Sequence, residues 1–114
     1  MAGVLDSFRL DGQVALVTGA GSGVGAAFAL AMAEAGADVA CIDLVTDAAA
    51  STADQIRALG RRALVVRADV TREDDCIAMV SASVAGLGSL EIAFANAGIA
   101  GVFVRRILQC SSLD

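Results

Sequence analysis

The sequence predicts an α/β fold, a doubly wound parallel sheet whose strands alternate with helices. The first observation is a short run of valine and leucine that leads into a glycine-rich turn over residues 14–25. Continuous apolar runs of this kind are typical of strands covered on both faces. The second observation is that apolar segments of strand length alternate with longer alanine-rich helical segments. This alternation indicates parallel βαβ units with right-handed crossovers.

The elements follow in order along the chain. We expect strands at residues 13–18, 38–42, 62–68 and 90–95, and helices at residues 23–35, 46–59 and 71–87. Thr46 and Thr71 are expected to cap the second and third helices. Gly36 and Gly60 are expected to end the first two helices, and Gly86 and Gly88 to mark the end of the third. The faces expected to be buried are Val24, Phe28, Ala31, Met32 and Ala35, then Ala49, Ala53 and Ile56, then Ile77, Val80, Val84 and Leu87. The expected sheet order is 3-2-1-4, the first half of a Rossmann-type fold, truncated.

Composition excludes several classes of protein. The 114 residues are expected to form one partial domain, with no second domain. A net charge of −5 argues against nucleic acid as a partner, and the pairs Arg61-Arg62 and Arg105-Arg106 are expected to be solvated. No uncharged apolar run reaches about 18 residues, so no membrane span is predicted. Cys41, Cys76 and Cys110 are widely spaced, which favours reduced structural cysteines in a cytoplasmic protein.

The turn after the first strand is rich in glycine and leads into a helix. Glycine allows sharp turns without Cβ atoms, and a helix N-terminus favours a bound phosphate. Two registers are possible, because the dinucleotide pattern G-x-G-x-x-G/A fits Gly21, Gly23 and Ala26, whereas a second pattern starts at Gly19. The strand is expected to end just before Gly19, which favours the second register. There Gly19 makes the turn, Gly23 admits the pyrophosphate and Gly25 allows close packing of helix on strand.

Asp43 ends the second strand, about 20 residues beyond the turn. A carboxylate there can accept hydrogen bonds from both ribose hydroxyls of adenosine, and it repels a 2′-phosphate. No arginine or lysine adjoins Asp43 in the sequence, so the predicted cofactor is NAD rather than NADP. Asp69 is predicted to receive the adenine amino group and Val70 to pack on the ring. The predicted cofactor-binding residues are Gly19, Ser22, Gly23, Val24, Gly25, Asp43, Asp69, Val70, Asn96, Ala97 and Gly98. No catalytic and no metal-binding residue is predicted.

Together these motifs resemble the short-chain dehydrogenase/reductase family. They are Thr18-Gly19-x-x-x-Gly23-x-Gly25, the acidic Asp43, Asp69-Val70, and Asn96-Ala97-Gly98. Ala95 departs from the family, which commonly has an asparagine there. The resemblance implies hydride transfer between a nicotinamide cofactor and a small alcohol or carbonyl substrate. It also implies that a full-length form, as a homo-oligomer, would carry out this reaction.

The family's catalytic serine, Tyr-x-x-x-Lys and helix asparagine have no counterpart in this sequence. The chain contains no histidine, tyrosine or lysine, the side chains most used for proton transfer near neutral pH besides carboxylates and thiols. We therefore expect an NAD-binding part of an oxidoreductase that is inactive by itself. Two alternatives stay open. One is a non-catalytic dinucleotide-binding module, and the other is part of an adenosylmethionine-dependent methyltransferase, whose first loop is also glycine-rich.

Overall fold

The computed structural model describes residues 9–95. Along the chain, the elements are β1 (Val14–Thr18), α2 (Gly23–Glu34), β2 (Asp38–Asp43), α3 (Thr46–Ala58), β3 (Ala63–Arg67), α4 (Glu73–Leu87) and β4 (Ile92–Phe94). The four strands form one parallel sheet in the order β3-β2-β1-β4, as the sequence predicted. The strands β1, β3 and β4 are shorter than expected by one to three residues, whereas β2 extends one residue further, to Asp43.

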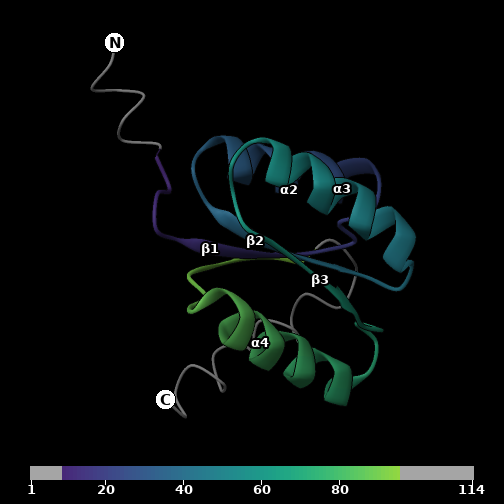
Figure 1. Ribbon diagram of the computed structural model, residues 1–114. Coiled ribbons are helices and arrows are strands. Elements are labelled where there is room, and N and C mark those ends of the chain that lie inside the picture. The colour runs from purple at the N-terminus through teal and green to yellow at the C-terminus, as the bar shows by residue number, and fades with distance from the viewer. Residues whose placement is uncertain (1–8, 96–114) are drawn as a thin grey trace.

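Three layers build the domain, with α2 and α3 on one face of the sheet and α4 on the other (Figure 1). Alternate residues of each strand serve the two faces. Leu16 and Ile42 belong to the core under α4, whereas Val17 and Cys41 belong to the core under α2 and α3. All five residues of β1 are buried, which explains why this strand reads as a continuous apolar run.

The buried face of α2 differs from the prediction. Gly25, Ala29 and Ala33 face the sheet, while Val24 is 65% exposed and Phe28 is only half-buried. Nearly every residue of this helix is apolar, so hydrophobic periodicity could not identify its inner face. Only small side chains fit between α2 and the sheet, because the helix approaches closely enough that a Cβ at Gly25 would clash with the backbone. Phe28 instead stacks on Phe94 of β4, with ring centroids 4.0 Å apart.

The buried faces of α3 and α4 follow the prediction to different degrees. Ala49, Ala53 and Ile56 of α3 are buried as expected, together with Thr52. On α4, Val80 and Leu87 are buried as expected, but Ile77 and Val84 are each 37% exposed. Their expected places are taken by Cys76, Met79 and Ser83. Ser83 fits a buried position because its hydroxyl donates to the Met79 carbonyl at 2.7 Å.

Both predicted threonine caps were wrong. Thr46 is the first residue of α3, and Val45 occupies the N-cap without a side-chain capping bond. The helix α4 begins after Arg72, and the Thr71 hydroxyl donates to Asp69 rather than to a helix amide. In these turns the Asp43 carboxylate accepts from the Val45 N–H, and the Asp69 carboxylate accepts from the Thr71 N–H. The glycines predicted after the helices are confirmed by positive φ angles at Gly36, Gly60 and Gly88. Gly86 lies inside α4, so the prediction that it marks the end of that helix was wrong.

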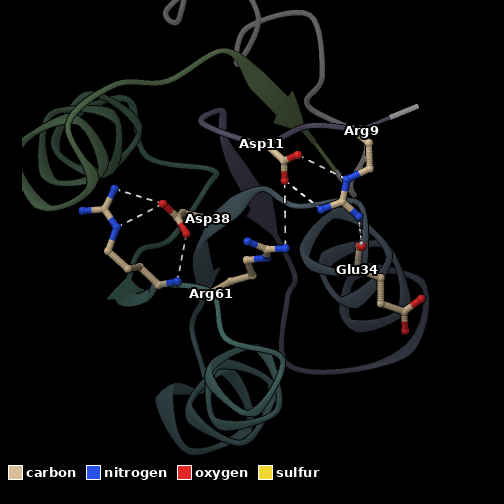
Figure 2. A network of polar contacts seen from close by, with 6 residues as sticks. Arg9, Asp11, Glu34, Asp38 and Arg61 are labelled. Atoms are coloured by element: carbon tan, nitrogen blue, oxygen red, sulfur yellow. Dashed lines mark hydrogen bonds and ion pairs between the residues drawn. The ribbon is translucent and has the colours of Figure 1, made fainter. Parts of the chain in front are cut away.

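Charged residues cross-link the amino ends of the strands (Figure 2). Arg9 pairs with Asp11 at 2.7 Å and also donates to the Glu34 carbonyl. Asp11 is in turn 3.9 Å from Arg61. The hydrogen bond from Arg9 is the main cause that lowers the pKa of Asp11. This network lies at the end of the sheet opposite the glycine-rich turn.

Arg62 belongs to the same end of the sheet, and its side chain is 62% exposed, as expected for a solvated residue, but it also makes specific contacts. Its guanidinium lies 2.9 Å from the Asp38 carboxylate and donates to the Leu87 carbonyl at 3.0 Å. One side chain therefore joins the start of β2, the segment before β3 and the last turn of α4. Within residues 9–95, no helix combines the length and apolar character that a membrane crossing needs.

Candidate functional site

The carboxyl ends of β1, β2 and β3 surround a cavity of about 180 Å³. Its lining consists of Thr18, Gly19, Ile42, Asp43, Leu44, Ala68 and Val70. Ligands of open α/β sheets bind at this edge, beyond the ends of the strands. The volume is below the roughly 300–1,000 Å³ typical of pockets for drug-sized ligands. The described part of the site therefore accommodates one portion of a dinucleotide, and its apolar walls with a single carboxylate suit an adenosine.

The glycine-rich turn has the register that begins at Gly19. The strand β1 ends at Thr18, and Gly19 follows it with φ +64°, a conformation that side chains rarely adopt. Gly23 opens α2 with φ +58°, and a Cβ added there would meet nothing within 4 Å. The backbone at Gly23 is therefore open to solvent and has no side chain, so a phosphate group could approach it closely.

Gly25 holds the first turn of α2 against β1. A Cβ at this position would lie 2.0 Å from the carbonyl oxygen of Gly19. No side chain fits there, so the packing role predicted for Gly25 is confirmed. The close approach fixes the N-terminus of α2, where unpaired N–H groups and the helix dipole favour an anion, directly over the turn. Ser22 precedes the helix in extended conformation, and its hydroxyl makes no capping hydrogen bond.

Neighbouring elements hold the turn in place through three hydrogen bonds. The Ala20 N–H donates to the Ile42 carbonyl at 3.1 Å, and the Ala20 carbonyl accepts from the Thr52 hydroxyl at 2.8 Å. The Gly21 N–H donates to the Asp43 carboxylate at 2.9 Å. Gly21 is itself required, because a Cβ would lie 2.6 Å from that of Ala48. These contacts preorganise the conformation of the turn without a bound ligand.

Asp43 has a double role at the end of β2. One carboxylate oxygen accepts from the Gly21 N–H, and the other accepts from the Val45 N–H at 3.1 Å. Each oxygen can accept a second hydrogen bond. The carboxylate lines the cavity and retains acceptor capacity for two hydroxyl groups, which is the arrangement that a ribose diol needs.

Asp69 and Val70 follow β3 but play different parts. Val70 lines the cavity, whereas Asp69 is not among the lining residues. One oxygen of Asp69 accepts from both the N–H and the hydroxyl of Thr71, and these bonds are the main cause that lowers the pKa of Asp69. The Asp69 N–H donates to the Asp75 carboxylate at 2.8 Å. Asp69 therefore carries a negative charge at neutral pH, fixed at the rim of the cavity.

The structure brings together Gly19, Asp43 and Val70 of the predicted site. Ser22, Gly23 and Val24 lie at the start of α2, where the turn meets the helix. Asn96, Ala97 and Gly98 lie outside the described residues. Sequence reasoning missed several lining residues, namely Thr18, Ile42, Leu44 and Ala68. Leu44 offered a signal in the sequence, because it is an apolar residue directly after Asp43. In the structure it is 51% exposed and presents an apolar surface beside that carboxylate.

The sheet brings a basic residue next to Asp43, although no arginine or lysine adjoins Asp43 in the sequence. The register of β2 and β3 pairs Asp43 with Arg67. Paired residues of neighbouring strands project to the same face of a sheet, so the two side chains emerge on the α2 and α3 side. The prediction considered only residues adjacent in the chain, and the sheet brings Arg67 in from another strand.

Other chemistries find little support in the described part of the chain. No group of three or more His, Cys, Asp or Glu side chains within residues 9–95 could hold a metal ion. Cys41 and Cys76 are buried free thiols. Burial raises the pKa of Cys41 to about 11 and also raises that of Cys76, so neither is a nucleophile at neutral pH.

Comparison with known proteins agrees with this geometry. The family model for short chain dehydrogenases matches residues 13–111. An uncharacterized oxidoreductase of Mycobacterium tuberculosis is 41% identical over 97% of this chain and 41% of its own length. A hydroxysteroid dehydrogenase from Escherichia coli is 41% identical with a TM-score of 0.78, covering 82% of this chain and 40% of its own.

A carveol dehydrogenase from Mycobacterium avium, solved in complex with NAD, is 33% identical with a TM-score of 0.74. It is matched over 79% of this chain and 37% of its own. The chain thus spans about two-fifths of the length of its relatives, over their cofactor-binding region. The methyltransferase alternative finds no support in these matches. The motifs, the sheet order and the matches together assign the chain to the short-chain dehydrogenase family.

Proposed function

We propose that this chain binds the adenosine and pyrophosphate portion of NAD for an oxidoreductase that acts on an alcohol or carbonyl group. The observation that carries the proposal is the cavity at the strand ends, where Asp43 meets the bare backbone of the glycine turn. An NAD complex of a relative supports the choice of cofactor class. In this proposal, residues 1–114 are part of one NAD(P)-binding domain, whose full-length form is a cytoplasmic homo-oligomer.

Each residue then has a defined task toward the cofactor. The carboxylate of Asp43 accepts hydrogen bonds from the ribose hydroxyls, while Leu44 and Val70 enclose the adenine. Asp69 accepts a hydrogen bond from the adenine amino group through the oxygen that Thr71 does not occupy. The N-terminus of α2, from Ser22 to Gly25, binds the pyrophosphate. Asn96, Ala97 and Gly98 are proposed to contact the cofactor from the end of β4.

The bound cofactor would accept or donate the hydride, and the chain would hold the cofactor in position. No tyrosine or lysine is present to move a proton to or from a substrate. The chain by itself should therefore bind a dinucleotide without turning over an alcohol or ketone. NAD-dependent turnover by the pure chain would contradict this assignment.

NAD is proposed as the preferred cofactor because the Asp43 carboxylate would face a 2′-phosphate. Repulsion between unit charges 4 Å apart ranges from about 1 kcal/mol in water to about 4 kcal/mol at an effective dielectric constant of 20. Isothermal titration calorimetry with NAD and NADP measures the preference directly. Replacing Asp43→Asn removes the charge and should reduce the ratio of NAD to NADP affinity by roughly tenfold.

The matched control is Asp47→Asn, which removes the same charge from the exposed first turn of α3. This variant should keep the cofactor preference of the parent chain. Absence of NAD binding by the parent chain would refute the proposed function. Binding with an unchanged preference in Asp43→Asn would refute only the role of Asp43. A non-catalytic dinucleotide-binding module remains the second candidate, and it is favoured if NAD binding occurs in a complete protein that lacks the Tyr-x-x-x-Lys motif.

A further inference from the structure

Arg67 is the cation closest in the sheet to the ribose-binding acid. It ends β3 in direct register with Asp43 of β2, and neighbouring strands lie about 4.8 Å apart. Both residues share the face that carries Val39 and Cys41 on β2 and Val65 on β3. The two charges therefore emerge side by side at the edge of the sheet where the cavity opens.

The Arg67 side chain is available for a ligand. It is exposed at the end of β3, and it forms no hydrogen bond or ion pair with any residue from 9 to 95. The arginines of the opposite end differ in this respect, since Arg9 and Arg62 are each held by an aspartate. A guanidinium suits a phosphate group because its planar donors bind two oxygens at once.

The field of Arg67 reaches the rim of the cavity. Its charge is the smallest of the causes that lower the pKa of Asp69, after the hydrogen bonds from Thr71 and the charge of Arg72. A positive charge beside Asp43 in the sheet reduces the negative potential that an incoming phosphate meets. Arg67 is thus placed to act on the charge that distinguishes NADP from NAD.

We propose that Arg67 is a second determinant of cofactor choice, which binds the 2′-phosphate of NADP and so partly offsets its repulsion by Asp43. The inference rests on the proposed function, because it requires a ribose at Asp43. The site then prefers NAD but accepts NADP with reduced affinity. The preference is set by two side chains on neighbouring strands rather than by the acid alone.

The test is calorimetric titration of the complete chain and its variants with NAD and NADP, and with 5′-AMP and 2′,5′-ADP. The two smaller ligands differ only in the 2′-phosphate and use only the adenosine portion of the site. Arg67→Gln should weaken NADP and 2′,5′-ADP by roughly five- to tenfold and leave NAD and 5′-AMP within about twofold. Arg67→Lys should restore part of the loss, and about 0.5 M salt should remove most of the difference.

Arg57→Gln is the matched control, since it removes the same charge from the last turn of α3, at the other end of β3. It should leave the discrimination between the paired ligands unchanged. An unchanged NADP to NAD ratio in Arg67→Gln, with NAD still bound, would overturn this inference and leave the proposed function intact. Failure of the parent chain to bind both NAD and 5′-AMP would overturn the two together.

Discussion

The hydroxyl of Thr52 in α3 donates a hydrogen bond of 2.8 Å to the carbonyl of Ala20 in the glycine turn. Thr52 is 2% exposed and Ala20 is fully buried, so neither group has access to solvent. The bond ties a helix of the second βαβ unit to the turn of the first. The conformation of the turn therefore depends on a residue that lies far from it in sequence.

Thr52→Val should destabilise the fold by about 1–3 kcal/mol, because the isosteric side chain leaves the Ala20 carbonyl buried without this donor. Urea unfolding followed by circular dichroism measures the loss. The same variant should bind NAD more weakly, since the turn is less firmly held. Thr46→Val is the control, because Thr46 is exposed at the start of α3. Equal stability of the two variants would show that the Thr52 bond contributes nothing.

Gly25→Ala should be the most damaging single-methyl change in the described chain. The added Cβ would lie 2.0 Å from the Gly19 carbonyl oxygen, and backbone atoms cannot move aside as a flexible side chain can. We expect a loss of about 3 kcal/mol or a failure to fold. Thermal unfolding of the purified variant provides the measurement.

Gly86→Ala is the matched helical control. Its Cβ would meet only the end of the Leu64 side chain, at 3.0 Å, and alanine favours the helix over glycine. We expect a change within about 1 kcal/mol of the parent. A Gly25→Ala melting temperature equal to that of Gly86→Ala would contradict the close contact between α2 and the turn.

Stability should fall at alkaline pH because of Cys41. Burial raises the pKa of this thiol from 9.0 to about 11 in the folded chain, whereas the unfolded chain keeps the ordinary value. Between these pH values the unfolded state has lost the proton that the native state still holds, so unfolding becomes easier as pH rises. Urea midpoints measured from pH 8 to pH 11 should decline, and Cys41→Ala should decline less steeply. A parallel decline in both proteins would rule out Cys41 as the source.

Arg62→Gln should destabilise the domain by about 1–2 kcal/mol. The change removes the ion pair with Asp38, whose side chain is only 20% exposed, and the donor to the Leu87 carbonyl. Arg72→Gln, at an exposed position before α4, is the charge-matched control and should change stability by less than about 0.5 kcal/mol. Chemical denaturation of both variants decides the point, and equal midpoints would refute the contribution of Arg62.

The sheet order was predictable because alternating strands and helices indicate a doubly wound fold, and the glycine turn was predictable because local backbone geometry determines it. The apolar run of β1 must be buried on both faces, and the turn at Gly19 needs a positive φ that few other residues adopt. The position of Asp43 at the end of β2 follows from the length of the apolar segment before it. Sequence patterns therefore predicted the fold and three of the seven residues that line the cavity.

Features that depend on contacts between distant residues were not predictable in this way. The inner face of α2 is chosen by its distance from β1, which favours Ala29 and Ala33, while hydrophobicity is uniform around the helix. Thr71 was expected to cap α4, but Asp69 competes for its hydroxyl. The pairing of Asp43 with Arg67 depends on strand register, which sequence spacing alone does not reveal.

The ion pairs of Arg9 with Asp11 and of Arg62 with Asp38 lie at the amino ends of the strands, whereas the glycine turn follows the carboxyl end of β1. This separation has an evolutionary consequence. Substitutions that alter ligand preference, such as changes at Leu44 or Arg67, leave the cross-links among the elements untouched. Cofactor preference and affinity can therefore change during evolution without compensating mutations that restore the stability of the fold.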